Sequence, residues 1–174
     1  PPLKIAINMS SRQFRQEDLS ERVSAIFATT GARPSDFILE LTESMVMQDV
    51  GSTLITLRAL KNLGLSISLD DFGTGYSSLS YLRRFPIDEL KIDKSFINDI
   101  HDNPDDAAIA SAIIAMAISL GLRVVAEGVE KKEQVDMLVG MGCVHVQGYF
   151  YARPMDACSF KERFLEQHTL SQDR

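Results

Sequence analysis

The feature that most restricts how this chain can fold is a regular alternation of strand-like and helix-like segments. Period-two alternation and short apolar runs predict strands at residues 3–9, 37–41, 65–70, 89–93, 123–127 and 144–147. Helical spacing of apolar residues predicts helices at 18–30, 51–63, 78–84, 104–120, 131–141 and 158–167. This order is typical of a parallel sheet covered by helices, so the predicted fold class is α/β.

Three of the predicted strands carry a polar face, which a flat sheet buried between helices does not explain. Buried parallel strands usually read as continuous apolar runs. The polar faces here are Lys4-Ala6-Asn8, Ser66-Ser68-Asp70 and Glu89-Lys91-Asp93. A TIM-like (β/α) barrel accommodates them, because its helices cover the outer faces of the strands while the inner faces line the lumen.

The number of strands bears on the domain boundaries. A closed (β/α) barrel of this type needs about eight strands, and six are predicted here. Either the barrel is open, or about a quarter of it lies upstream of Pro1. The second interpretation is favoured, because the chain begins at Pro1-Pro2 without a methionine and enters a strand almost at once. Residues 1–168 are therefore predicted to be part of a larger domain, and 169–174 to be a polar tail.

Polar side chains gather where the predicted strands end. They are Asn8, Glu40, Asp70, Asp93, Glu127 and Gln147. In a (β/α) barrel these ends share one rim, where active sites lie. The adjacent carboxylates Asp70 and Asp71 precede a glycine-punctuated loop, 72–76, and then Ser77-Ser78. Two interpretations stay open: a metal site beside a mobile loop, or a turn in which the aspartates cap the next element.

The side chains expected at this rim are mostly oxygen donors. The candidate metal ligands are Asn8, Glu40, Asp70, Asp71 and Glu127. Such a set favours hard cations such as Mg²⁺ or Mn²⁺. Two such ions ~3.5–4 Å apart are a common device for in-line displacement at phosphorus. Lys91, on the neighbouring strand, would then neutralise phosphate charge or orient the attacking water. With three histidines in the chain, an imidazole-rich zinc site is not expected.

Each candidate also has a purely structural explanation. Asn8 and Glu127 can be turn residues, and Glu43 can cap the helix that follows it. Lys91 can pair with Glu89 or Asp93 in a lumen network. Glu40 is harder to explain in this way, because an unpaired buried carboxylate is costly. It is the coincidence of these residues at strand ends that favours a functional site.

Composition excludes some classes of partner. The net charge of −6 offers no broad basic surface, so no nucleic-acid polymer is expected as a partner. The most apolar run, 107–122, is shorter than the ~20 residues that span a bilayer and predicts a buried helix. No membrane contact by this chain is therefore expected. Cys143 and Cys158 are predicted to be free thiols in a reducing cytoplasm.

With these residues in view, the chain resembles the EAL-domain family of cyclic-di-GMP phosphodiesterases from Ile5 to about Pro154. The matching motifs are Asn8-Met9-Ser10 with Gln13-Phe14, Glu40-Leu41-Thr42-Glu43-Ser44, Asp70-Asp71-Phe72-Gly73-Thr74-Gly75-Tyr76-Ser77-Ser78-Leu79, Leu90-Lys91-Ile92-Asp93, Ala126-Glu127-Gly128-Val129-Glu130, Gln147-Gly148-Tyr149 and Arg153-Pro154. So many ordered matches make the resemblance specific.

The resemblance implies a (β/α)₈-type barrel with one reversed strand and a two-metal site using Mg²⁺ or Mn²⁺. By resemblance, Asn8, Glu40 and Asp70 would hold one metal, Asp70 and Asp71 the second, with Glu127 nearby. Lys91 would act on the nucleophilic water, and Glu43 would pin the loop 72–76. Substrate would be contacted by Gln13, Asp93, Gln147 and Pro154. The implied reaction is hydrolysis of cyclic-di-GMP to linear pGpG, in a homodimer formed through the loop after Asp71 and the adjacent helix.

One departure from the family pattern matters. The Glu-Ala-Leu motif that names the family is absent from this sequence, and in the family it precedes the strand of Asn8. Its glutamate is a metal ligand, and a nearby arginine contacts the substrate phosphate. This chain alone is therefore expected to be inactive, and its intact parent domain to be the enzyme. Two alternatives stay open: a catalytically silent cyclic-di-GMP receptor or scaffold, and a Mg²⁺-dependent barrel enzyme for another phosphorylated metabolite.

Overall fold

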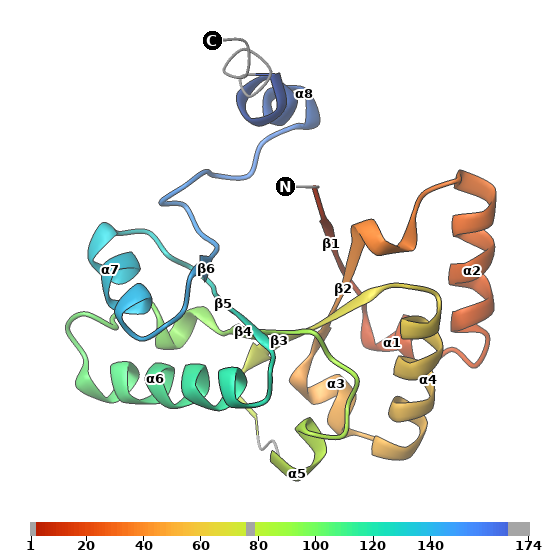
Figure 1. Cartoon of the computed structure of the whole chain (residues 1–174), viewed down its shortest axis with the longest axis horizontal. Helices are drawn as coiled ribbons and strands as arrows, with labels where there is room; N and C mark the ends of the chain where they lie inside the picture. Colours follow the sequence, from red (N-terminus) through yellow and green to blue (C-terminus); the bar gives the residue numbers. More distant parts are fainter. Residues whose placement is uncertain (1–2, 76–78, 167–174) are drawn as a thin grey trace.

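The computed structural model describes residues 3–75 and 79–166, which form one curved sheet with helices around it (Figure 1). The sheet has six parallel strands in the order of the chain: β1 Ile5–Asn8, β2 Phe37–Thr42, β3 Ser66–Phe72, β4 Glu89–Ile92, β5 Arg123–Ala126 and β6 His145–Val146. Because consecutive strands are neighbours throughout, the sheet follows the strand order of an open (β/α) barrel. The predicted fold class is confirmed.

Helices lie between most of the strands. They are α1 Ser11–Phe14, α2 Leu19–Thr30, α3 Glu43–Met47, α4 Val50–Asn62, α5 Leu79–Leu82, α6 Pro104–Ser119, α7 Lys132–Gly140 and α8 Ala157–Phe160, with 3₁₀ turns η1 Pro34–Asp36 and η2 Lys94–Phe96 and a π-helical segment η3 Lys161–Glu166. The prediction missed α1 and α3, which are short. The predicted last helix divides into α8 and η3. Its end at 167, the tail 169–174 and Ser78 lie outside the described residues.

The hydrophobic core lies between the outer face of the sheet and the helices. Leu65, directly before β3, and Ile67 and Leu69 on β3 are almost fully buried and belong to this core. Leu57 and Leu60 of α4 belong to the same buried cluster. Figure 1 shows α2, α3 and α4 beside β1 to β3, and α6 and α7 beside β4 to β6. The outer face is therefore held by apolar burial, as expected for a (β/α) fold.

The inner face of the central strands is also buried, although it is polar. Its buried members are Glu40, Ser68, Asp70, Glu89 and Lys91. Burial of charged groups is costly unless they are paired. Here the charges pair across strands in two groups, Lys91 with Glu40 and Asp70, and Glu89 with Arg123.

The first strand is exposed along its whole length. Ile5 and Ile7, which a closed barrel would cover with helices, keep 48% and 42% of their surface exposed. The physical reason is that β1 is an edge strand, with β2 as its one neighbour among the described strands. At the other edge, β6 likewise pairs with β5 alone. Within 3–75 and 79–166, no helix is long and apolar enough to cross a bilayer.

Candidate functional site

The end of β3 brings two adjacent carboxylates to the same side of the sheet. Consecutive side chains of a regular strand point to opposite faces, so Asp70 and Asp71 would normally diverge. The pairing of β3 with β4 is irregular between Leu69 and Phe72, and Asp71 has φ of +54°. This left-handed residue turns the second carboxylate toward the first, and the Asp71 N–H donates to Asp70 Oδ1 at 3.0 Å.

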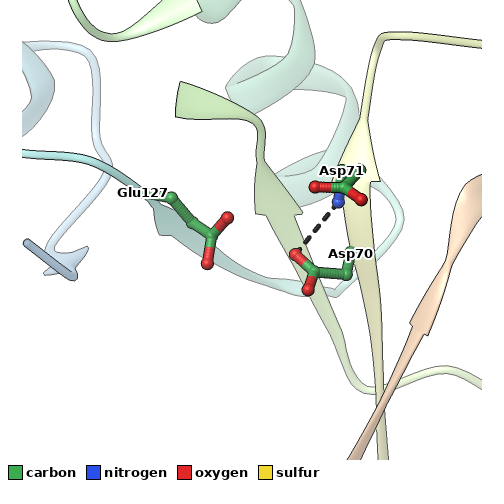
Figure 2. A group of neighbouring side chains, drawn as sticks. All are labelled: Asp70, Asp71 and Glu127. Carbon is green, nitrogen blue, oxygen red and sulfur yellow. Dashed lines mark hydrogen bonds between the residues drawn. The ribbon is translucent and has the colours of Figure 1, made fainter. Parts of the chain in front are cut away.

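A third carboxylate, Glu127, faces the same space from the end of β5 (Figure 2). One oxygen from each of Asp70, Asp71 and Glu127 lies within 4.8 Å of the other two. Strand order alone would not predict this closeness, since β4 separates β3 from β5. The curvature of the sheet, together with the bulge at Asp71, makes the three side chains converge.

Lys91 lies at the centre of the charged group. Its Nζ contacts Glu127 Oε1 at 2.6 Å, Glu40 Oε1 at 2.9 Å and Asp70 Oδ1 at 3.2 Å. The Lys91 side chain is 4% exposed. We name Glu40, Asp70, Asp71, Lys91 and Glu127 the rim cluster. It brings together residues of β2, β3 and β4 with Glu127, which directly follows β5.

The structural pairing of Lys91 with Glu89 or Asp93, which the sequence left open, does not occur. Glu89 instead accepts a hydrogen bond from Arg123 at 3.0 Å, below the rim cluster along the strands. Asp93 caps η2 by accepting from the Ser95 N–H at 2.9 Å. The ammonium of Lys91 therefore forms its ion pairs with the carboxylates at the strand ends.

The rim cluster holds more negative than positive charge, and its ionisation reflects this. Burial raises the pKa of Glu127 above its usual value, against the lowering effect of the Lys91 hydrogen bond. Burial also raises the pKa of Asp71, and repulsion from Asp70 and Asp93 adds to the shift. Burial alone would lower the pKa of Lys91, but hydrogen bonds to Glu127 and Glu40 raise it. Additional positive charge would therefore be favourable at this position.

The ligand atoms that the rim cluster offers are of the kind that binds divalent cations. Its available ligands are carboxylate oxygens, which Mg²⁺ and Mn²⁺ prefer. Four carboxylates face one ammonium, so the internal charge is not balanced. The donor set and the excess charge both suit hard metal ions.

Glu43 connects α3 to the loop that follows β3. Its side chain is buried, and its Oε2 accepts the Gly73 N–H at 3.0 Å. A Cβ at Gly75 would lie 2.7 Å from Glu43 Oε1, so only glycine fits there without a shift. The carboxylate thus contacts this loop, which the sequence suggested beside the alternative of a helix cap. Tyr76, the end of the predicted loop, lies outside the described residues.

The remaining predicted site residues are placed less centrally. Asn8 is exposed and is the register partner of Glu40. Gln147 and Glu127 both line a cavity of about 380 Å³. Pro154 lines a neighbouring groove of about 430 Å³, which Gln147 also lines. Gln13 accepts hydrogen bonds from the Ser10 N–H and hydroxyl at the start of α1. Among the described residues, neither Gln13 nor Pro154 forms a hydrogen bond or ion pair with the rim cluster.

The sequence did not point to Lys94 and Asn98, which line the 380 Å³ cavity beside Glu127. The available signal was Gly128. A Cβ there would lie 2.6 Å from the Lys94 Cβ, so this glycine permits the segment after β5 to pack against η2. A glycine directly after Glu127 indicated a turn, but its packing partner comes from another part of the chain.

Comparison with known proteins gives a consistent result. The family model described as EAL domain matches residues 1–154. MucR of Pseudomonas aeruginosa, a bifunctional diguanylate cyclase/cyclic di-GMP phosphodiesterase, is 48% identical over 153 residues, which are 88% of this chain and 22% of that protein. The chain therefore spans about a fifth of the length of this relative.

Solved structures are similar in fold as well as in sequence. The PaMucR phosphodiesterase in complex with c-di-GMP has a TM-score of 0.87 and 46% identity, and the match covers 90% of this chain and 64% of that one. Klebsiella pneumoniae BlrP1, in its manganese and cy-diGMP complex, has a TM-score of 0.79 and 34% identity, covering 87% of this chain and 39% of that one.

Proposed function

This chain belongs to the EAL-domain family, and from that premise we propose that it is the larger part of a catalytic domain that hydrolyses cyclic-di-GMP to linear pGpG. The observation that carries the proposal is the convergence of the Asp70, Asp71 and Glu127 oxygens within 4.8 Å. Relatives named as cyclic-di-GMP phosphodiesterases and a relative solved with c-di-GMP support the choice of substrate.

We propose Mg²⁺ or Mn²⁺, two ions per site, as the cofactor. Asn8, Glu40 and Asp70 would hold one ion, and Asp70, Asp71 and Glu127 the other. Such ions supply Lewis-acid stabilisation of charge on phosphate oxygens and lower the pKa of bound water. The manganese in the BlrP1 complex supports the type of cofactor. The excess carboxylate charge of the rim cluster gives independent support.

In the proposed reaction, water adds to one phosphorus, the bond to the 3′ oxygen breaks, and that oxygen leaves with a proton. Lys91 lies beside the carboxylates and would orient the water or balance phosphate charge there. Glu127, whose Oε1 lies 2.6 Å from the Lys91 Nζ, would accept or relay a proton. Glu43 would hold the loop after β3 in place through the Gly73 N–H.

Substrate contacts are proposed for residues around the rim cluster. Gln147 and Asp93 flank the cluster at the ends of β6 and β4, and Pro154 lines the adjoining groove. Gln13 would reach the dinucleotide from α1. The 380 Å³ cavity that joins Glu127 to Gln147 offers space for part of such a ligand.

We further propose that residues 1–168 are one part of the catalytic domain, and that further strands complete the barrel. The open edges at β1 and β6 support this, as does the 64% coverage of the PaMucR structure.

A homodimer through the loop after Asp71 and α5 is proposed from the family resemblance, and sedimentation of the complete domain tests it. A cytoplasmic site of action is proposed from the two free cysteines, one buried and one exposed.

The test is hydrolysis of cyclic-di-GMP in Mg²⁺ or Mn²⁺ by this chain and by a chain extended at its N-terminus. We expect the longer chain to release pGpG and this chain to release none. If the longer chain binds cyclic-di-GMP without turning it over, the receptor function replaces the enzyme. If it neither binds nor hydrolyses the dinucleotide, the proposed substrate is wrong, and other phosphorylated metabolites become the candidates.

A further inference from the structure

The ammonium of Lys91 contacts the oxygens that the proposed metal ions would need. Its partners are Glu127 Oε1, Glu40 Oε1 and Asp70 Oδ1, at 2.6, 2.9 and 3.2 Å. All three carboxylates belong to the proposed ligand set. In this arrangement the lysine is therefore the cation around which the carboxylates gather.

The position of Lys91 in the sheet makes this contact specific. Lys91 is on β4, whereas Glu40 is on β2, so the lysine side chain must pass over β3 to reach it. Ser68, two residues before Asp70 on β3, is fully buried, and its hydroxyl has no hydrogen-bond partner among the described residues. Ser68 is also the register partner of Glu40, so a small side chain lies on β3 beside the carboxylate that the lysine reaches.

The internal charge balance is incomplete. Glu40, Asp70, Asp71 and Glu127 are four carboxylates, and among the described residues Lys91 is the one cation that forms ion pairs with them. Lys94 acts on Asp71 as a second, more distant positive charge. Asp71 forms no ion pair with Lys91. The Lys91 ammonium thus reduces the mutual repulsion of the carboxylates without neutralising them.

We propose that Lys91 is an internal counter-cation that divalent metal ions must displace from the rim carboxylates. The lysine then holds the metal-free site together and lowers its affinity for metal by competing for the same oxygens. This inference rests on the proposed function for the identity of the metal ions. It goes further in giving Lys91 a role before any substrate is present.

The opposite role is also well defined and makes the opposite prediction. If Lys91 instead preorganised the carboxylates for metal, removing its charge would weaken metal binding. If it competes, removing its charge strengthens metal binding. The sign of the change in affinity decides between the two roles.

The test compares the unaltered chain with Lys91→Met, which keeps the length of the side chain and removes its charge. Mn²⁺ binding is measured by calorimetry, and thermal unfolding is followed both in EDTA and in saturating Mn²⁺. We expect Lys91→Met to bind Mn²⁺ about tenfold or more tightly, as expected from removing one nearby charge in a partly buried site. Its Tm should fall in EDTA, and the deficit should shrink in Mn²⁺ because metal binding stabilises the folded state.

Lys61→Met is the matched control. Lys61 also forms a close ion pair, with Asp88 at 2.6 Å, and Asp88 in turn accepts the Ile67 N–H before the rim end of β3. Loss of this pair should lower Tm equally in EDTA and in Mn²⁺ and leave Mn²⁺ affinity unchanged. A change in affinity in this control as large as in Lys91→Met would mean that any lost lysine has the effect, which overturns the inference.

A second measurement covers the case in which Lys91→Met does not fold. The Nζ resonance of Lys91, assigned with Lys91→Arg, is followed by NMR while Mg²⁺ is added to the unaltered chain. Displacement should shift this resonance, and a signal that stays fixed at metal saturation overturns the inference.

Equal or weaker Mn²⁺ binding by folded Lys91→Met also overturns it, while the proposed function survives. Absence of Mn²⁺ binding by the unaltered chain and by its N-terminally extended form contradicts the metal-dependent function itself.

Discussion

Among single residues, Asp71 combines a backbone role with a chemical one. Its φ of +54° lies in the left-handed region, which aspartate tolerates better than most side chains. This conformation lets two consecutive carboxylates face one site, because it breaks the up-and-down alternation of β3. Burial, together with repulsion from Asp70 and Asp93, raises the pKa of Asp71 and so opposes its charge. Its carboxylate is therefore retained at a cost, which is typical of functional residues.

The substitution Asp71→Asn separates these two roles. Asparagine also tolerates the left-handed region, so the free energy of unfolding without metal should stay the same or rise slightly as the repelled charge is removed. Metal-dependent turnover of the complete domain should fall by about 10–100-fold or more, since even outer partners of metal ligands have effects of this size. Chemical unfolding in EDTA and a cyclic-di-GMP hydrolysis assay measure the two effects. Unchanged turnover would contradict the two-metal assignment.

The residues of the rim cluster were predictable for a simple physical reason. Strand ends of a parallel barrel share one edge, so polar residues at those ends were expected to meet. The partners of Lys91 were not predictable in the same way. Glu89 and Asp93 lie two residues away from it in sequence, but Glu89 pairs with Arg123 and Asp93 caps η2. Curvature of the sheet brings Glu40 and Glu127 to the lysine instead. The left-handed conformation of Asp71 also has no sequence signal beyond the tolerance of aspartate for it.

Among the elements, the short helices α1 and α3 show the limit of predicting helices from the spacing of apolar residues. Each has too few residues to display a helical repeat of apolar side chains. The start of α1 did carry a signal, since Ser10 and Gln13 form a capping box. The start of α3 carried none, because the N-cap Thr42 makes no capping bond and Glu43 contacts the loop after β3 instead. This helix is thus placed by tertiary contacts.

The contact between Glu43 and the loop makes a prediction for Gly75→Ala. The new Cβ would lie 2.7 Å from Glu43 Oε1, so the carboxylate must move from its place beside the Gly73 N–H. We expect turnover of the complete domain to fall by about 10–100-fold, as for small displacements near a reacting centre. The free energy of unfolding should fall by about 1–3 kcal/mol, because the buried Glu43 carboxylate loses its hydrogen bond with the Gly73 N–H.

The control for this loop is Gly140→Ala, at the end of α7, where an added Cβ meets nothing within 4 Å. Alanine favours the helix over glycine, so this variant should be at least as stable as the unaltered chain and fully active. Equal turnover in the two variants would mean that Glu43 does not act through the loop.

For the whole molecule, the main feature is that the sheet is open and leaves apolar side chains of its edge strand β1 exposed. The outer faces of β3 and β4 are buried against helices, whereas Ile5 and Ile7 on β1 stay exposed at 48% and 42%. Apolar residues that alternate along an edge strand are typical of a face that another element covers. The sequence indicated a strand here but did not reveal its exposure, because exposure depends on neighbours in space. If further strands and helices complete the barrel, these isoleucines should become buried.

The substitution Ile7→Thr tests this arrangement in two lengths of chain. Threonine is also β-branched and suits a strand, so the change mainly removes apolar surface. In this chain it should cost no more than about 0.5 kcal/mol, because the site is exposed. In the N-terminally extended chain it should cost about 1–2 kcal/mol, because a buried side chain that loses apolar surface also loses hydrophobic stabilisation. Ile67→Thr, at a position with 0% exposure, is the control and should cost about 2 kcal/mol or more in both chains. Urea unfolding gives each value, and an equally small cost of Ile7→Thr in both chains would mean that the added strands do not cover this side of β1.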